Sequence, residues 1–176
     1  ATLGNIAYGS AAADLITALL VLDTVVVTAE PRGRHRVALT DYLAASRGAD
    51  SLLVEVAIPA LPNGQWSFQR FARTEPDLPV ANAAAGLQLD SRGRVKWARL
   101  ALGGAASVPF RASSVEELMR GRIFDRTLLA EAGGEVMRAV EPASDCRASA
   151  GYRRELSRVL MGRALEACAA QAGCSL

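Results

Sequence analysis

Apolar residues along the first 58 positions form short runs that are separated by small and polar residues. The β-branched run TVVVT predicts a strand, and the Ala- and Leu-rich run before it predicts a helix with Ser10 as its N-cap. A short helix capped by Thr40 or Asp41 follows, and then an apolar strand ended by Pro59. The expected elements are a helix over residues 11–22, strands over 24–28 and 35–39, a short helix over 42–45 and a strand over 51–58.

The pattern changes after residues 60–65 (ALPNGQ), where Pro, Asn and Gly gather. This composition predicts a boundary between a domain over residues 1–60 and a second domain over residues 64–176. The second domain is expected to contain three strands and then three helices, with Gly93 taking a positive φ in the turn between the last two strands. The strands are expected over residues 66–73, 80–89 and 94–103, and the helices over 113–120, 125 or 126 to 138, and 151–172.

This order of elements predicts an α+β fold, in which three helices cover one face of a three-stranded antiparallel sheet. Ser113 or Ser114 followed by Glu116 and Glu117 indicates a capping box at the first of these helices. The last helix has one apolar face, with its arginines placed largely elsewhere. That face consists of Leu156, Leu160, Ala164 and Leu165, and the arginines are at 153, 154, 158 and 163.

Composition and charge narrow the classes of function. Of the 176 residues, 51% are hydrophobic, which is enough for the core of one large or two small domains. The net charge is only +2 and arginines are scattered among acids, so nucleic-acid binding is not indicated. No apolar run approaches the ~20 residues that a membrane span requires.

The side chains that most often carry chemistry are sparse. Cys146, Cys168 and Cys174 have no CxxC spacing, so no metal cluster or disulfide framework is predicted, and we expect reduced thiols in a cytoplasmic protein. His35, the only histidine, lies between two arginines with no carboxylate or nucleophile evident beside it. No nucleophile–base pair can be assembled, so the sequence predicts no catalytic residue.

The opening stretch offers the clearest candidate for a binding site. A tight Gly turn over residues 2–5 and a second break at Gly9 lead to Asp14, just ahead of the apolar run 15–22. A small-residue loop that enters a helix brings backbone N–H groups and the positive end of the helix towards a ligand. Such loops also simply cap helices, and the local chemistry leaves both interpretations open.

Four motifs carry a resemblance to one family. The first, Thr2-Leu3-Gly4-Asn5 followed by Ser10, Asp14 and Leu15, is similar to T-x-G-G-N and S-x-x-x-D-L, with the same Asn-to-Asp spacing and one glycine fewer. The others are similar to E-x-L-x-x-I-x-I-P over residues 51–59, to S-x-F-x-K-x-x-x-R over 67–73 with Gln69 in the position of the lysine, and to D-x-R-x-S-A-x-Y-R over 145–153. The chain thus resembles the flavoprotein (medium) subunit of the molybdenum hydroxylases, the family of xanthine dehydrogenase and carbon monoxide dehydrogenase.

The resemblance implies a fold and a cofactor, FAD. Residues 1–60 would end a PCMH-type FAD-binding domain, residues 64–176 would form a CO dehydrogenase flavoprotein C-terminal-like domain, and the chain would be the C-terminal portion of a longer subunit. Asp14 would accept a hydrogen bond from the ribityl chain or a neighbouring N–H. Gln69 would keep a donor near the flavin but lose the charge of the family's lysine. The other implied cofactor contacts are Thr2, Leu3, Gly4 and Asn5 at the front, and Leu53 with its neighbour Leu52 against the flavin ring.

The function implied by the resemblance is electron transfer. A large subunit with the molybdenum cofactor would oxidise substrate, and a small subunit would pass electrons through [2Fe–2S] clusters to the FAD of this chain. The FAD would deliver them to an acceptor such as NAD or oxygen. The alternative is a non-catalytic assembly or interaction domain that keeps the fold without competent flavin binding. The sequence does not predict the substrate of the large subunit.

Overall fold

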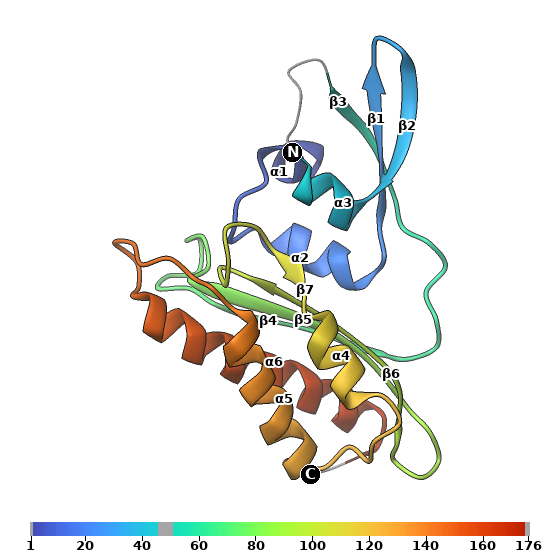
Figure 1. Cartoon of the computed structure of the whole chain (residues 1–176), viewed down its shortest axis with the longest axis vertical. Helices are drawn as coiled ribbons and strands as arrows, with labels where there is room; N and C mark the ends of the chain where they lie inside the picture. Colours follow the sequence, from blue (N-terminus) through green and yellow to red (C-terminus); the bar gives the residue numbers. More distant parts are fainter. Residues whose placement is uncertain (1, 46–50, 175–176) are drawn as a thin grey trace.

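The N-terminal part of the chain combines a small antiparallel sheet with short helices in the computed structural model, which describes residues 2–45 and 51–174. Its elements are α1 (Thr2–Tyr8), α2 (Asp14–Val21), β1 (Val25–Glu30), β2 (Gly33–Ala38), α3 (Leu39–Ala44) and β3 (Leu52–Ala57). The strands pair in the order β2-β1-β3, and α1 packs against both β3 and α2. Figure 1 shows this sheet projecting from one end of the molecule, with the helices beneath it.

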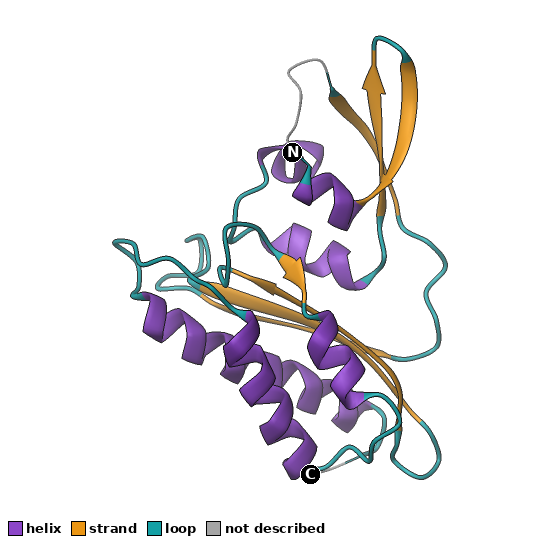
Figure 2. Cartoon of the chain, in the orientation of Figure 1, coloured by secondary structure: helices purple, strands orange, loops and turns teal. Residues whose placement is uncertain are grey.

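The C-terminal part is a larger antiparallel sheet followed by three helices (Figure 2). Its elements are β4 (Gln65–Phe71), β5 (Ala81–Leu89), β6 (Val95–Gly103), β7 (Phe110–Arg111), α4 (Ser113–Met119), α5 (Arg126–Ala139) and α6 (Ala150–Gln171). The strand order is β4-β5-β6-β7. The α+β fold is confirmed, but the sheet has a fourth strand that the sequence analysis missed, because β7 has only two residues and shows no periodic pattern.

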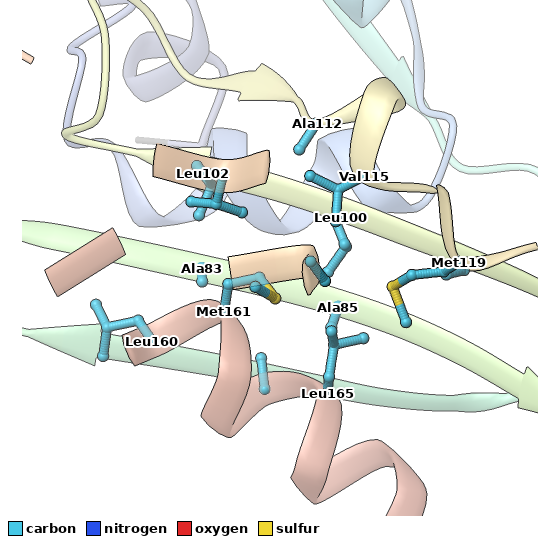
Figure 3. Close-up of a cluster of buried hydrophobic side chains, with 14 of the residues drawn as sticks. Ala83, Ala85, Leu100, Leu102, Ala112, Val115, Met119, Leu160, Met161 and Leu165 are labelled. Atoms are coloured by element: carbon cyan, nitrogen blue, oxygen red, sulfur yellow. The ribbon is translucent and has the colours of Figure 1, made fainter. Parts of the chain in front are cut away.

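Both faces of the larger sheet are covered, whereas the sequence predicted helices on one face only. Alternate residues of β5 and β6 point to a core made with α4 and α6 (Figure 3), and residues of α5 belong to the same core. The other face carries small residues, and Ala84 and Ala101 there share a second core with Ile16 and Leu20 of α2. Because these alanines are small, α2 can pack closely on the sheet, and the N-terminal part is fixed to the C-terminal part through this helix.

The C-terminal end of α2 is tied to the same sheet by arginines. Arg99 donates to Val21 O and Arg111 donates to Leu20 O, both at 3.2 Å. Each guanidinium also lies 2.5 Å from a carboxylate oxygen of Asp23. Cations at a helix C-terminus are favourable because the last carbonyl groups carry partial negative charge, so these contacts stabilise the docked position of α2.

The opening stretch is a helix, which corrects the predicted tight turn and loop. Ile6 of α1 is fully buried in the second core and Leu3 packs against it, so tertiary burial stabilises a helix that contains Gly4. The following helix begins at Asp14 rather than at residue 11. Its N-cap is Ala13, without a side-chain cap, so the prediction that Ser10 caps this helix was wrong.

Two other predicted helix caps are wrong, and the predicted hairpin turn is confirmed. The N-caps of α3 and α4 are Ala38 and Ala112, neither with a capping side chain, so the Thr40 or Asp41 cap and the capping box were wrong. Glu116 instead accepts hydrogen bonds from Leu100 N and Arg111. The predicted hairpin turn is confirmed, since Gly93 has a φ of 72°.

Cys168 gives the fold a testable dependence on alkaline pH. Its side chain is fully buried against β5, with Sγ 3.7 Å from Ala85 O, and burial raises the pKa of its thiol from 9.0 to about 12. The unfolded chain therefore loses this proton first, and we expect the free energy of unfolding to fall as the pH rises from 9 to 12. Urea unfolding at a series of pH values measures this fall.

The Cys168→Ala variant is the control for the other groups that titrate in this range, and its unfolding free energy should fall less steeply with pH. Thiol labelling adds an independent check. The exposed Cys146 should react in the folded protein, whereas Cys168 should react only on unfolding. Equal labelling rates for the two thiols in the folded protein would contradict the prediction.

Candidate functional site

A half-exposed carboxylate at the start of α2 lies between the N-terminal part of the chain and the larger sheet of the C-terminal part. Asp14 Oδ1 accepts a hydrogen bond from Asn82 Nδ2 at 2.7 Å, and Asp14 Oδ2 lies 3.2 Å from Arg70 Nε. We call these three residues the Asp14 cluster. Since a carboxylate in the first helical turn is also favoured by the helix dipole, Asp14 is held in place from three directions while 39% of its side chain stays exposed.

Arg70 connects the Asp14 cluster to the loop between β4 and β5. Its Nη1 donates to Glu75 O at 3.0 Å and its Nη2 donates to Asp77 O at 2.7 Å. The loop that contains these carbonyl groups is therefore fixed to α2 through a single guanidinium. Arg70 also puts a permanent positive charge beside Asp14.

The predicted residues of α1 and β3 lie together, because α1 packs on β3. Gly4 and Asn5 are exposed, and a Cβ on Gly4 would meet nothing within 4 Å, so the helix backbone is open to a ligand there. Leu53 is only 6% exposed and belongs to the second core, whereas Leu52 is 67% exposed. Of the two leucines, Leu52 is the one that offers apolar surface. Thr2 begins α1, but its side chain lies outside the described residues.

The structure does not bring Gln69 to the Asp14 cluster. Gln69 pairs with Ala83 across the β4–β5 ladder, and Ala83 belongs to the core on the α6 side of the sheet. Its amide donates to Ser67 Oγ at 3.3 Å. Arg70, one position later in the strand, is on the α2 side and reaches Asp14. The period-two pattern of the strand was the signal that separates the two residues.

The candidate site consists of two groups. One is the carboxylate and guanidinium of the Asp14 cluster, and the other is the exposed amide, open backbone and apolar Leu52 surface on α1 and β3, where α1 packs against both β3 and α2. Such a mixture suits an organic ligand that has a polar chain and an apolar part, with the polar groups fixing its orientation. His35 is exposed on β2 and lies 3.9 Å from Glu30. In the part of the chain that the structure describes, no three His, Cys, Asp or Glu side chains are placed to hold a metal ion, and no helix could cross a membrane.

Two family models match the chain, one for each predicted domain. Residues 1–61 match the FAD binding domain in molybdopterin dehydrogenase, and residues 66–168 match the CO dehydrogenase flavoprotein C-terminal domain. Together they cover nearly all the sequence.

Individual proteins agree with these matches. The chain is 29% identical to the 6-hydroxypseudooxynicotine dehydrogenase complex subunit alpha of Paenarthrobacter nicotinovorans, covering 92% of this chain and 56% of that protein. It is also 29% identical to the carbon monoxide dehydrogenase medium chain of Afipia carboxidovorans, covering 96% and 60%. Among solved structures, a chain of the Cu,Mo-CO dehydrogenase in its cyanide-inactivated form superposes with a TM-score of 0.88 at 26% identity, covering 96% and 60%.

The chain thus spans somewhat more than half the length of the curated relatives that it matches. Both halves of the chain match the same kind of subunit, in the same order, and the fold agrees with a solved member. The chain belongs to the FAD-binding medium subunits of the molybdenum hydroxylases, and residues 66–168 are its CO dehydrogenase flavoprotein C-terminal domain.

Proposed function

We propose that this chain forms part of an FAD-binding subunit that takes electrons from the [2Fe–2S] clusters of a partner subunit and passes them to an acceptor such as NAD or oxygen. The observation that supports this most is the agreement of both halves with the family in one collinear chain. When bound, FAD supplies the redox chemistry, and the protein supplies binding and orientation.

The residues present are of the kind that FAD requires. Gly4 leaves open space at α1, Asn5 offers an exposed amide, and Asp14 can accept a hydrogen bond from a hydroxyl or N–H. Leu52 would give the ring an apolar surface and exclude water from one side of it. Arg70 would favour negative charge near the Asp14 cluster, and it would supply a positive charge of the kind that the sequence has lost at Gln69.

The proposed partners are a large subunit with the molybdenum cofactor and a small subunit with [2Fe–2S] clusters, assembled in the cytoplasm. The relatives carry names with different substrates, a nicotine derivative in one and carbon monoxide in another. A shared medium subunit in enzymes with such different substrates is expected if substrate is oxidised elsewhere. The substrate would therefore be selected by the large subunit.

The proposal predicts that the natural full-length chain retains flavin. After mixing with FAD and desalting, it should show the visible flavin absorption bands, and Asp14→Ala should weaken retention roughly tenfold by loss of a charged hydrogen-bond partner. In the assembled complex, anaerobic addition of the complex's own substrate should bleach these bands, and NAD or oxygen should restore them.

The flavin-retention measurement and the bleaching measurement each have an outcome that contradicts the proposal. A folded full-length chain that retains no flavin would favour the assembly domain. Retention without bleaching in an active complex would leave FAD binding intact and overturn electron transfer through it. Ser114→Ala, an exposed change on α4, is the matched control and should retain flavin like the unaltered chain.

A further inference from the structure

The connection between α1 and α2 is held by donors of the C-terminal sheet. Gly104 N donates to Ala11 O at 2.6 Å, and Asn82 Nδ2 donates to Ala12 O at 3.5 Å. Both carbonyl groups lie in the short segment that leads into Asp14. The path of the chain from α1 to α2 is thus fixed by residues of the other domain.

Asn82 is a destabilising choice of residue for its position in β5. It is fully buried in an alanine-rich strand, and its Oδ1 has no hydrogen-bond partner among residues 2–45 and 51–174. A buried unpaired carbonyl oxygen costs the folded state free energy, so an alanine here would relieve a penalty. What asparagine provides is Nδ2, which donates to Asp14 Oδ1 at 2.7 Å. The hydrogen bond to Asp14 therefore explains why this position holds an asparagine.

The neighbouring strand leaves room for this amide. Gly103 of β6 pairs with Asn82, and a Cβ on Gly103 would collide with Asn82 Oδ1 and with Thr17 Oγ1 of α2. Thr17 in turn donates to Ala13 O at 3.2 Å. The backbone of β6, the amide of Asn82 and the first turn of α2 therefore meet with no other side chain between them, which leaves the amide little freedom to move.

The two oxygens of the Asp14 carboxylate have different partners: Oδ1 accepts a hydrogen bond from Asn82, and Oδ2 forms an ion pair with Arg70. Without Asn82, the side-chain partner left to Asp14 among the described residues would be Arg70, whose long side chain is 32% exposed. A carboxylate held on one side only can rotate, so it would present its free lone pairs in many directions. Asn82 is the buried and rigid one of the two partners.

We propose that Asn82 is a positioning residue for the proposed flavin site. It acts through Asp14 and through the carbonyl group of Ala12, and holds the carboxylate in the orientation that accepts a hydrogen bond from bound FAD. This inference rests on the proposed function, because it takes Asp14 as a flavin contact. If Asn82 positions Asp14, a residue of the larger, C-terminal sheet contributes to flavin binding.

The test uses Asn82→Ala in the natural full-length chain. The dissociation constant for FAD, measured by the change in flavin fluorescence on binding, should rise roughly tenfold, the loss of one hydrogen bond to a charged group. The visible circular dichroism of the remaining bound flavin should change, and amide hydrogen exchange over residues 9–14 should become faster without FAD. The urea midpoint should change little, because the unpaired Oδ1 is removed as well.

Two further variants separate positioning from stability. Asn82→Ser carries a hydroxyl too short to reach Asp14 and should weaken FAD binding similarly. Ser157→Ala removes another fully buried polar group, which donates to Arg153 O at 2.8 Å on α6, and should leave FAD binding and the flavin spectrum unchanged. Wild-type binding and spectra in both Asn82 variants, or unfolding of both, would overturn the inference. An unaltered chain that binds no FAD would instead refute the proposed function, and hydrogen exchange would still report whether Asn82 orders residues 9–14.

Discussion

Replacing Arg153 with methionine should lower the free energy of unfolding by about 3–5 kcal/mol, because two buried carbonyl groups each lose a hydrogen bond from a charged donor, worth ~1.5–3 kcal/mol. Arg153 is 3% exposed in α6, and its Nη1 donates to Val80 O at 2.5 Å and to Gly104 O at 3.5 Å. Its Nη2 donates to Asp145 Oδ1 at 2.7 Å. Methionine fills the space but leaves both buried carbonyl groups without this donor. Urea unfolding of the purified protein measures the loss.

Arg163→Met is the matched control, since Arg163 is exposed on the same helix, and its effect should stay within about 0.5 kcal/mol. The dependence of the unfolding free energy on acidic pH gives a second check. Hydrogen bonds from Arg147, and then from Arg153, hold the pKa of Asp145 well below its usual value of 3.8. These bonds stabilise the fold above about pH 4 and are lost as the pH falls, so Arg153→Met should show less acid destabilisation. Equal effects of the Arg153 and Arg163 changes would contradict the assignment.

Arg153 also shows where sequence reasoning stops. Periodicity located α6 and its apolar face correctly, because Leu156, Leu160 and Leu165 recur at helical spacing and are buried. The same pattern assigns every arginine to the surface. Which arginine is buried depends on where the carbonyl groups of Val80, just before β5, and Gly104, just after β6, need a donor, and that is set by tertiary structure.

The opening helix was missed for a related reason. Gly4 and the small residues after it indicate a turn by local propensity, yet α1 forms because Ile6 enters the core beneath β1 and β3. Tertiary burial outweighs a propensity cost of about 1 kcal/mol for one glycine. The same core explains the second covered face of the sheet, since Ala84 and Ala101 gave no sign in the sequence of which helix they would meet.

The candidate site was predictable in part. Asp14 and the α1 residues were found through the motif, and the structure packs α1 on β3 and joins Asp14 to Asn82 of β5. Asn82 and Arg70 were missed, because their link to Asp14 spans 68 and 56 positions of sequence and leaves no local pattern. The side of the sheet on which Arg70 lies could have been predicted, since alternate positions along β4 put Arg70 and Gln69 on opposite faces, with Arg70 on the α2 side.

Replacing Gly104 with alanine should lower the free energy of unfolding by about 3 kcal/mol or more, from backbone strain and a steric clash together. Gly104 has a φ of 72°, and a Cβ there would collide with Val80 O and lie 3.1 Å from Ala81 Cα. Neither backbone atom can move freely, because Val80 O is held by Arg153. Displacing Gly104 would also break its hydrogen bond to Ala11 O and loosen the segment before α2.

Gly121 supplies a control that separates the two causes. Its φ is 76°, close to that of Gly104, but a Cβ there would meet nothing within 4 Å. Gly121→Ala therefore carries the backbone strain alone and should cost about 1 kcal/mol. Urea unfolding of both variants gives the difference, which is the energy of the close approach between Gly104 and β5. Equal losses of unfolding free energy would mean that the backbone at Val80 moves to admit the new Cβ, so that the close approach at Gly104 adds no cost of its own.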